Sequence, residues 1–192
     1  LVPENQPALE AVPVVPLVYE CLPLIRQVAA QMVQLADADA EGVVREEVHI
    51  PALDPDDPDV RCLVYRPKRS AAKLGAYLHL HGGGYILGSA EGSDQHNVLL
   101  AGQLGIVIVS VDYRLAPEHP VPAGLDDSYA ALAWMHQNAD ELGVDTDRIA
   151  IGGESAGGGL AAALAIHARD KGEYPICFQL LTYPMLDDRT GS

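Results

Sequence analysis

The hydrophobic positions of this chain fall into short runs that repeat one order from residue 76 onward. Apolar runs of strand length occupy 76–80, 106–111, 148–151 and 177–182. Between them, apolar residues at helical spacing occupy 97–104, 125–141 and the segment that follows residue 155. Strands that alternate with helices predict an α/β fold, with a mostly parallel sheet and helices on both faces.

The first part of the chain has a different pattern. Two strands are predicted at 43–50 and 61–65, on either side of a loop rich in proline and aspartate at 51–59. The acidic cluster of this loop is interpreted as a solvated turn, because prolines interrupt any metal-ligand spacing. Apolar residues over 22–36 fall at helical spacing and predict a helix of about three turns. This helix either packs on the surface of the core or forms a lid over an active site. Before it, several prolines predict short turns over 1–23.

Composition narrows the class of protein. The chain has 192 residues, of which 48% are hydrophobic, so it can bury a core as a globular domain. Its net charge of −15 argues against nucleic acid and membrane partners, which need clusters of Lys and Arg. Three distant cysteines show neither a disulfide framework nor a metal pattern, which favours a cytoplasmic setting. The N-terminus lacks a signal-peptide layout, and no apolar run has the length of a membrane span.

A Gly-x-Ser-x-Gly pattern at 153–157 lies between a predicted strand and a predicted helix. A serine on such a sharp turn has strained backbone angles, which expose its hydroxyl. Side chains two positions before and after would collide across the turn, so Gly153 and Gly157 are needed there. Ser155 is therefore the predicted nucleophile. A phosphate-binding loop is disfavoured, because neither the Gly-Lys-Ser/Thr ending nor the Gly-x-Gly-x-x-Gly spacing is present.

A second glycine-rich segment, 81–84, follows the strand at 76–80. Acyl transfer passes through a tetrahedral oxyanion, which each preorganised backbone N–H stabilises by roughly 3–4 kcal/mol. Consecutive glycines let such donors approach a substrate. The amide of Ala156, at the start of the following helix, is a further donor. His81 is interpreted as an anchor for this loop rather than as a base.

Three blocks of residues occur in a characteristic order: His81-Gly82-Gly83-Gly84-Tyr85, Asp112 to Pro120, and Gly153-Glu154-Ser155-Ala156-Gly157-Gly158. Together they resemble the hormone-sensitive-lipase-like carboxylesterases, a branch of the α/β-hydrolase fold. The resemblance extends over about 43–189. Glu154 stands where that family more often has Asp, which leaves the turn intact.

The resemblance implies a site and a domain division. It implies a helical cap over 1–40, a hydrolase core over 41–192, and hydrolysis of short-to-medium acyl esters without cofactor or metal. The elbow is formed by Gly153, Glu154 and Gly157 around Ser155. The implied oxyanion donors are Gly83, Gly84 and Ala156, with Gly82 as a further candidate, and Tyr85 either lines the pocket or packs.

Other polar residues have structural interpretations. Asp112 and Arg114 are predicted to pair and to fix the loop after the strand at 106–111. Asp126 and Asp127 are predicted to open the next helix, where carboxylates suit the helix dipole.

The catalytic base is missing from the pattern. A serine nucleophile needs a base and an orienting carboxylate, which follow it in this fold in the order Asp/Glu, then His. Only His167 follows Ser155, and twelve helical residues place it about 18 Å away. Asp187 and Asp188 follow the last predicted strand, where some α/β-hydrolases carry the triad acid. The family that this chain resembles instead has its acid and base further along the chain.

We therefore expect both groups beyond residue 192, in a C-terminal portion or a second chain. The expected sheet has about six strands where the fold usually has eight, which leaves 177–182 as an exposed apolar edge. The 192 residues alone are expected to be inactive. Two alternatives stay open: a non-catalytic ligand-binding module of the same fold, and an inactive truncated fragment. The oligomeric state is left open.

Overall fold

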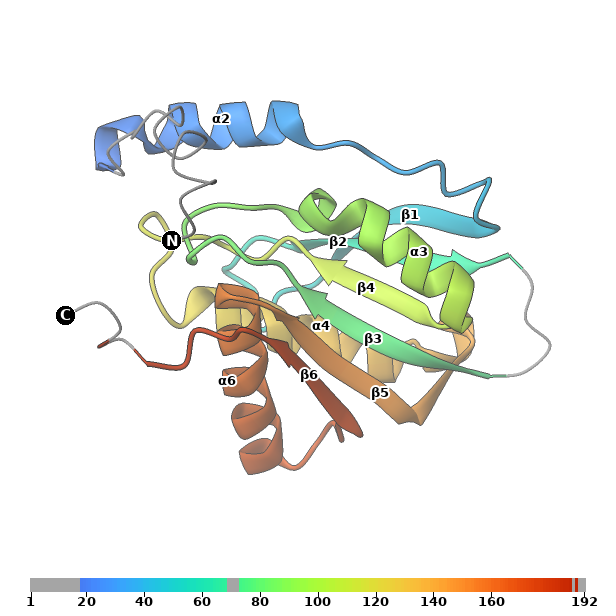
Figure 1. Ribbon diagram of the computed structural model, residues 1–192. Coiled ribbons are helices and arrows are strands. Elements are labelled where there is room, and N and C mark those ends of the chain that lie inside the picture. Colours follow the sequence, from blue (N-terminus) through green and yellow to red (C-terminus); the bar gives the residue numbers. More distant parts are fainter. Residues whose placement is uncertain (1–17, 69–72, 188, 190–192) are drawn as a thin grey trace, which may run out of the picture. The chain divides into compact units, whose positions relative to one another are not determined.

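The computed structural model describes residues 18–68, 73–187 and 189 (Figure 1). The chain divides into two compact units, Leu1–Met32 and Val33–Ser192. The described part of the first unit holds a 3-10 turn, η2 (Tyr19–Cys21), and the helix α2 (Leu22–Met32). Its eleven residues make about three turns, as predicted, but the helix ends at Met32, before the predicted limit at residue 36. The turns expected over 1–17 lie outside the described residues.

The second unit is built on one sheet. In the part of the chain that the structure describes, six strands lie in the order β1-β2-β4-β3-β5-β6. They are β1 (Val43–Ile50), β2 (Val60–Pro67), β3 (Leu74–Leu80), β4 (Val107–Val111), β5 (Val144–Glu154) and β6 (Phe178–Thr182). β2 is antiparallel to both β1 and β4, whereas β4, β3, β5 and β6 run parallel. The predicted α/β fold with a mostly parallel sheet is confirmed.

The helices connect and cover these strands. They are α3 (Asp94–Leu104), which follows the 3-10 turn η3 (Ala90–Ser93), α4 (Ala123–Gln137), α5 (Ala139–Leu142) and α6 (Ala156–Lys171). The helix predicted over 125–141 is thus two helices. They separate at Asn138, whose side-chain amide donates to the carbonyl of Trp134 at 2.9 Å.

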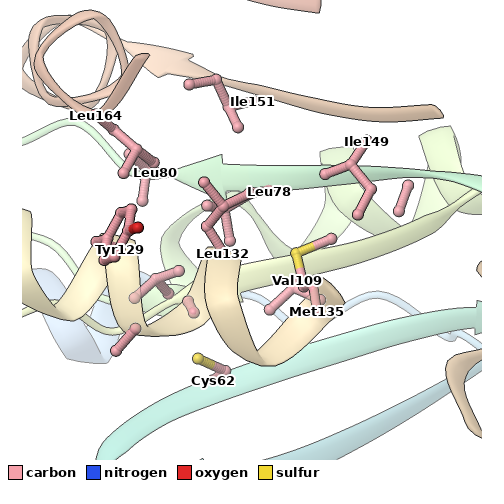
Figure 2. Packing of buried hydrophobic residues seen from close by; sticks show 14 of the residues in the cluster. Cys62, Leu78, Leu80, Val109, Tyr129, Leu132, Met135, Ile149, Ile151 and Leu164 are labelled. Carbon is pink, nitrogen blue, oxygen red and sulfur yellow. The ribbon is translucent and has the colours of Figure 1, made fainter. Parts of the chain in front are cut away.

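Each face of the sheet buries a hydrophobic cluster, because successive strand residues point to opposite faces. On one face, α4 and α6 pack against the strands, as Figure 2 shows for Leu78, Ile151, Leu132 and Leu164. On the other face, α3 covers a cluster that includes Tyr77. Because β3 and β5 are parallel neighbours, their carboxyl ends lie together at one end of the sheet, where the candidate site lies.

β6 forms one edge of the sheet and is largely exposed. Phe178 is 61% exposed and Leu180 is 47% exposed. The apolar edge predicted for 177–182 is therefore observed.

The three cysteines, Cys21, Cys62 and Cys177, are all described, and each is a free thiol. Cys62 is buried, and burial raises the pKa of its thiol. A cytoplasmic setting stays a prediction. Across the described ranges, no helix combines the length and apolar character needed to cross a membrane.

Candidate active site

The site begins at the sharp turn between β5 and α6. Ser155 is the one residue between them, with φ 55° and ψ −116°, a conformation that costs a non-glycine residue about 1–3 kcal/mol. Three backbone hydrogen bonds hold it. Its N–H donates to the carbonyl of Thr182 at 3.0 Å, and its carbonyl accepts from Gly159 at 3.0 Å and Met185 at 2.9 Å. The surrounding structure thus fixes the strained geometry of an elbow.

Glycine is required on both sides of Ser155 by the backbone of β3. A Cβ added at Gly153 would lie 2.0 Å from the carbonyl oxygen of Leu80, and one at Gly157 would lie 1.9 Å from the same atom. The added Cβ at Gly153 would also lie 2.9 Å from Gly157. The sequence pattern predicted the collision across the turn. The larger collision is with the neighbouring strand, which a local pattern does not reveal.

The structure brings the glycine loop 82–84 against this elbow. A Cβ at Gly82 would lie 3.0 Å from the carbonyl oxygen of Glu154 and 3.6 Å from the Cβ of Ser155. Gly83 has φ 126°, and a Cβ there would lie 2.1 Å from the carbonyl oxygen of Leu87. Gly84 also has a positive φ, of 63°. Two loops that are 70 residues apart in sequence therefore meet at Ser155 with little side-chain bulk between them.

Ala156 is the buried first residue of α6. Its amide therefore belongs to the helix N-terminus, where unpaired N–H groups and the helix dipole favour negative charge.

His81 fixes the start of the glycine loop. Its ring stacks on Tyr113, with centroids 4.2 Å apart, and its Nδ1 lies 2.8 Å from the carbonyl oxygen of Gly82. The hydroxyl of Tyr113 donates to the carbonyl of His81 at 2.7 Å. Burial lowers the pKa of His81, although the hydrogen bond to Gly82 and nearby carboxylates oppose this. These contacts agree with the interpretation of His81 as an anchor for the glycine loop.

Tyr85 lines a cavity of about 170 Å³ next to the elbow. Its backbone has φ 64°, and its carbonyl accepts from the N–H of Ala116 at 2.9 Å. Its hydroxyl fills the space that a side chain at Gly159 would occupy, since an added Cβ there would lie 2.5 Å away. The lining is largely apolar and includes Tyr113, Leu125, Leu160 and Ala163. Both interpretations of Tyr85 apply, because it lines the cavity and also packs against the hydrophobic core.

The predicted pair of Asp112 and Arg114 is wrong. Asp112 pairs with Arg61 at 3.2 Å, across to β2. Arg114 pairs with Asp57 at 2.7 Å and with Asp127 at 2.9 Å. Arg61 and Asp57 lie 51 and 57 residues from their partners, and Asp127 lies on the helix after the loop, so a local pattern could not show that both side chains were already engaged.

The same contacts bear on two further interpretations. The acidic loop at 51–59 is a largely exposed turn, as predicted, and Asp57 within it also pairs with Arg114. Asp127 is buried and also accepts the backbone N–H of Arg114 at 2.7 Å, so it fixes the loop before α4. Asp126 lies in the first turn of α4 as predicted, and burial raises its pKa.

No described histidine forms a hydrogen bond with the Ser155 hydroxyl. His167 packs edge-on against Tyr129 on α4, with centroids 4.8 Å apart, in agreement with its interpretation as a packing residue. Asp187 pairs with Arg189 at 2.8 Å. Asp188 lies outside the described residues. Within the described ranges, no group of three or more His, Cys, Asp or Glu side chains is placed to hold a metal ion.

One pair beside the elbow was not predicted. His79 is fully buried on β3, and its Nε2 lies 3.1 Å from Oε2 of Glu154. Burial alone would raise the pKa of Glu154, but the hydrogen bond from His79 and the charges of His79 and His96 lower it overall. The signal in the sequence was a histidine inside an apolar strand, two residues before His81.

Comparison with known proteins relates the chain to hydrolases. A family model described as alpha/beta hydrolase fold matches residues 77–192. The carboxylesterase NlhH of Mycobacterium tuberculosis is 51% identical over 129 residues, which cover 66% of this chain and 40% of that protein. The ethyl acetate hydrolase of Pseudomonas putida is 38% identical over 127 residues, with 65% of this chain and 40% of that protein covered.

Solved structures give the same picture. A bacterial heroin esterase matches with a TM-score of 0.87 and 42% identity, covering 100% of this chain and 60% of that chain. The thermophilic carboxylesterase EstE1, from a metagenomic library, matches with a TM-score of 0.73 and 42% identity, covering 88% of this chain and 54% of that one. The chain thus spans less than two thirds of the length of each of these relatives.

Proposed function

The chain belongs to the hormone-sensitive-lipase-like carboxylesterases of the α/β-hydrolase superfamily, and we propose that it supplies the nucleophile and oxyanion hole of a serine carboxylesterase. The observation that carries this proposal is the strained Ser155, with its positive φ, directly beside the glycine loop. Ser155 attacks the ester carbonyl, and the backbone amides of Gly83, Gly84 and Ala156, with Gly82 as a further candidate, stabilise the oxyanion. The alcohol leaves, an acyl-enzyme remains on Ser155, and water hydrolyses it.

The general base and its orienting carboxylate come from outside residues 1–192 in this proposal. The base accepts the Ser155 proton during attack and returns it to the leaving alcohol. No described histidine bonds to Ser155, and the chain spans 40% of NlhH, which supports this view. The 192 residues alone would then lack hydrolytic activity. The division into a cap over 1–40 and a core over 41–192 also remains a prediction.

The acyl group of the substrate is short to medium in length. A cavity of about 170 Å³ next to Tyr85 supports this range, since an apolar cavity of about 150 Å³ accepts a molecule as large as benzene. The relative from P. putida is named for the hydrolysis of ethyl acetate, a short-chain ester. Its name supports a small acyl group.

A matched pair of variants tests the nucleophile. In the full-length polypeptide, Ser155→Ala should abolish hydrolysis of p-nitrophenyl acetate and labelling by a fluorophosphonate. Ser93→Ala, on η3, should retain both. Equal hydrolysis by the wild type and Ser155→Ala would refute Ser155 as the nucleophile. A folded wild-type protein that forms no adduct would instead favour a ligand-binding module.

A further inference from the structure

The imidazole of His79 joins the elbow to the interior of the molecule. Its Nε2 contacts the Glu154 carboxylate at 3.1 Å, while its Nδ1 lies 3.1 Å from the hydroxyl of Ser110 and 3.4 Å from the amide of Asn97. The hydroxyl of Ser110 donates to the carbonyl of Ala90 at 3.0 Å. His79, Ser110 and Asn97 are all fully buried. The imidazole is therefore held on both sides and cannot rotate without loss of buried hydrogen bonds.

The register of the sheet explains why a glutamate can reach this histidine. His79 on β3 is paired with Gly152 on β5, and Glu154 lies two residues further, on the same face. Gly152 has no side chain to stand between them. An aspartate would be shorter by one carbon–carbon bond, about 1.5 Å, and would not span the gap. The length of Glu154 thus matches the position of His79.

Glu154 also contacts the backbone that holds the catalytic serine. It is the last residue of β5, immediately before Ser155, and it is paired with Thr182, whose carbonyl accepts the Ser155 N–H. Its own carbonyl oxygen would lie 3.0 Å from a Cβ at Gly82, so it touches the glycine loop. A shift of Glu154 would displace both the nucleophile and the loop that faces it.

We propose that His79 is a positioning residue for the hydrolytic reaction: it holds the Glu154 carboxylate and thereby fixes the end of β5 that presents Ser155. This inference rests on the proposed function. It differs from a purely structural role, because it predicts that an unpaired Glu154 is more harmful to the reaction than no carboxylate at all.

The test is a double-mutant cycle in the full-length enzyme. His79→Leu should lower kcat by roughly 10- to 100-fold with KM changed less than about threefold, because small misplacements of reacting groups cost factors of this size. Glu154→Gln keeps the length without the charge. The double variant His79→Leu/Glu154→Gln should recover kcat to within about threefold of Glu154→Gln alone, as expected for directly coupled residues.

Two conservative variants separate the length of the Glu154 side chain from its charge. They also test the proposal if His79→Leu does not fold. Glu154→Asp keeps the charge but not the reach, so its kcat should fall as far as that of His79→Leu. His79→Gln keeps a donor at this position and should retain most of the activity. His49→Leu is the matched control, because His49 forms an exposed pair with Glu47 at 3.2 Å on the edge strand β1, which β2 and β4 separate from β3.

The outcomes are distinguishable. Hydrolysis that depends on Ser155 but shows independent, multiplicative losses at His79 and Glu154 would overturn the inference and leave the proposed function standing. An unchanged kcat in both His79→Leu and Glu154→Asp would do the same. A folded enzyme without Ser155-dependent hydrolysis would overturn the proposed function itself.

Discussion

At the scale of single residues, the site depends on backbone conformation more than on side-chain chemistry. Ser155 adopts a positive φ that is unfavourable by about 1–3 kcal/mol, and three backbone hydrogen bonds offset this strain. The adjacent strand leaves no room for a side chain at Gly153 or Gly157. The shape of the elbow therefore depends on the lack of side chains at Gly153 and Gly157 as much as on the serine itself.

This dependence predicts the effect of adding one methyl group at Gly157. In Gly157→Ala the new Cβ would lie 1.9 Å from the carbonyl oxygen of Leu80 and 2.5 Å from that of His81, so backbone must move. We expect the free energy of unfolding to fall by about 3 kcal/mol or more, at or above the usual range for overpacking. Gly92→Ala has nothing within 4 Å and should change it by less than about 0.5 kcal/mol. Urea unfolding of both variants would measure the difference, and similar values would contradict the argument.

His81 should make stability depend on pH. Burial lowers its pKa in the folded protein, whereas the unfolded chain binds a proton at this residue below about pH 6.5. Between these two pKa values the unfolded state holds more protons, so stability is present above about pH 6.5 and is lost as the pH falls. Melting curves from pH 7.5 to 5 should show a smaller decrease of Tm in His81→Asn than in the wild type. Identical slopes would show that His81 is not the titrating group. His136, whose pKa burial also lowers, contributes to the slope that remains.

The residues of the elbow and the glycine loop could be predicted from the sequence because their motifs are local. The glycines and Ser155 occur within short segments whose turn chemistry is readable. The pair of His79 and Glu154 was missed, since it joins two strands that are 75 residues apart and depends on the register between them. For the same reason Asp112 and Arg114 were paired wrongly, although their true partners lie elsewhere in the fold.

At the scale of elements, Arg114 connects the acidic loop, the segment after β4 and the start of α4. Its two partners differ in burial: the Asp127 side chain is 2% exposed and that of Asp57 is 37% exposed. We expect Asp127→Asn to destabilise the fold by about 3 kcal/mol, because it removes the charge of the buried partner and leaves the Arg114 guanidinium with the more exposed Asp57. Asp57→Asn should cost at most about 1 kcal/mol, since water screens that pair. Chemical denaturation would rank the two, and the reverse order would exclude Asp127 as the principal partner.

The wall that α6 contributes to the cavity offers a test of acyl selectivity. Ala163 lines the cavity and Ala162, its neighbour on the same helix, does not. Ala163→Leu should lower kcat/KM for p-nitrophenyl hexanoate by roughly tenfold or more relative to the acetate, as is usual when a pocket changes by a few methylene groups. Ala162→Leu should leave the ratio unchanged. An equal ratio in both variants would mean that the acyl chain binds elsewhere.

The elements themselves were largely readable from the sequence. β1 and β6 lie within a residue of their predicted limits, because apolar runs bounded by turn residues are distinctive. β5 is longer than predicted, since it begins at Val144 and continues through Gly152 and Gly153. Glycines weaken a strand and conceal it from pattern analysis, yet these two are required by the close approach of neighbouring backbone.

At the scale of the whole molecule, the alternation of strands and helices predicted the layered architecture but not the order of the strands. The sequence order of β3 and β4 is reversed in the sheet, so β3 lies beside β5 and the glycine loop lies beside the elbow. That exchange creates the site. It follows from right-handed crossover connections and from packing on both faces, which involve the entire chain rather than any one segment.

The exposed edge at β6 leads to a prediction about the 192-residue polypeptide when it is prepared alone. A sheet edge with apolar side chains presents unpaired backbone groups to other molecules, and such edges associate. Phe178 is 61% exposed on this edge, whereas Leu104, which is 63% exposed, ends α3. We expect light scattering with size-exclusion chromatography to show concentration-dependent association of the polypeptide. Phe178→Lys should reduce it, because a charge on an edge strand opposes pairing, and Leu104→Lys should have little effect. Equal reduction by both variants would attribute the association to general surface hydrophobicity rather than to the sheet edge.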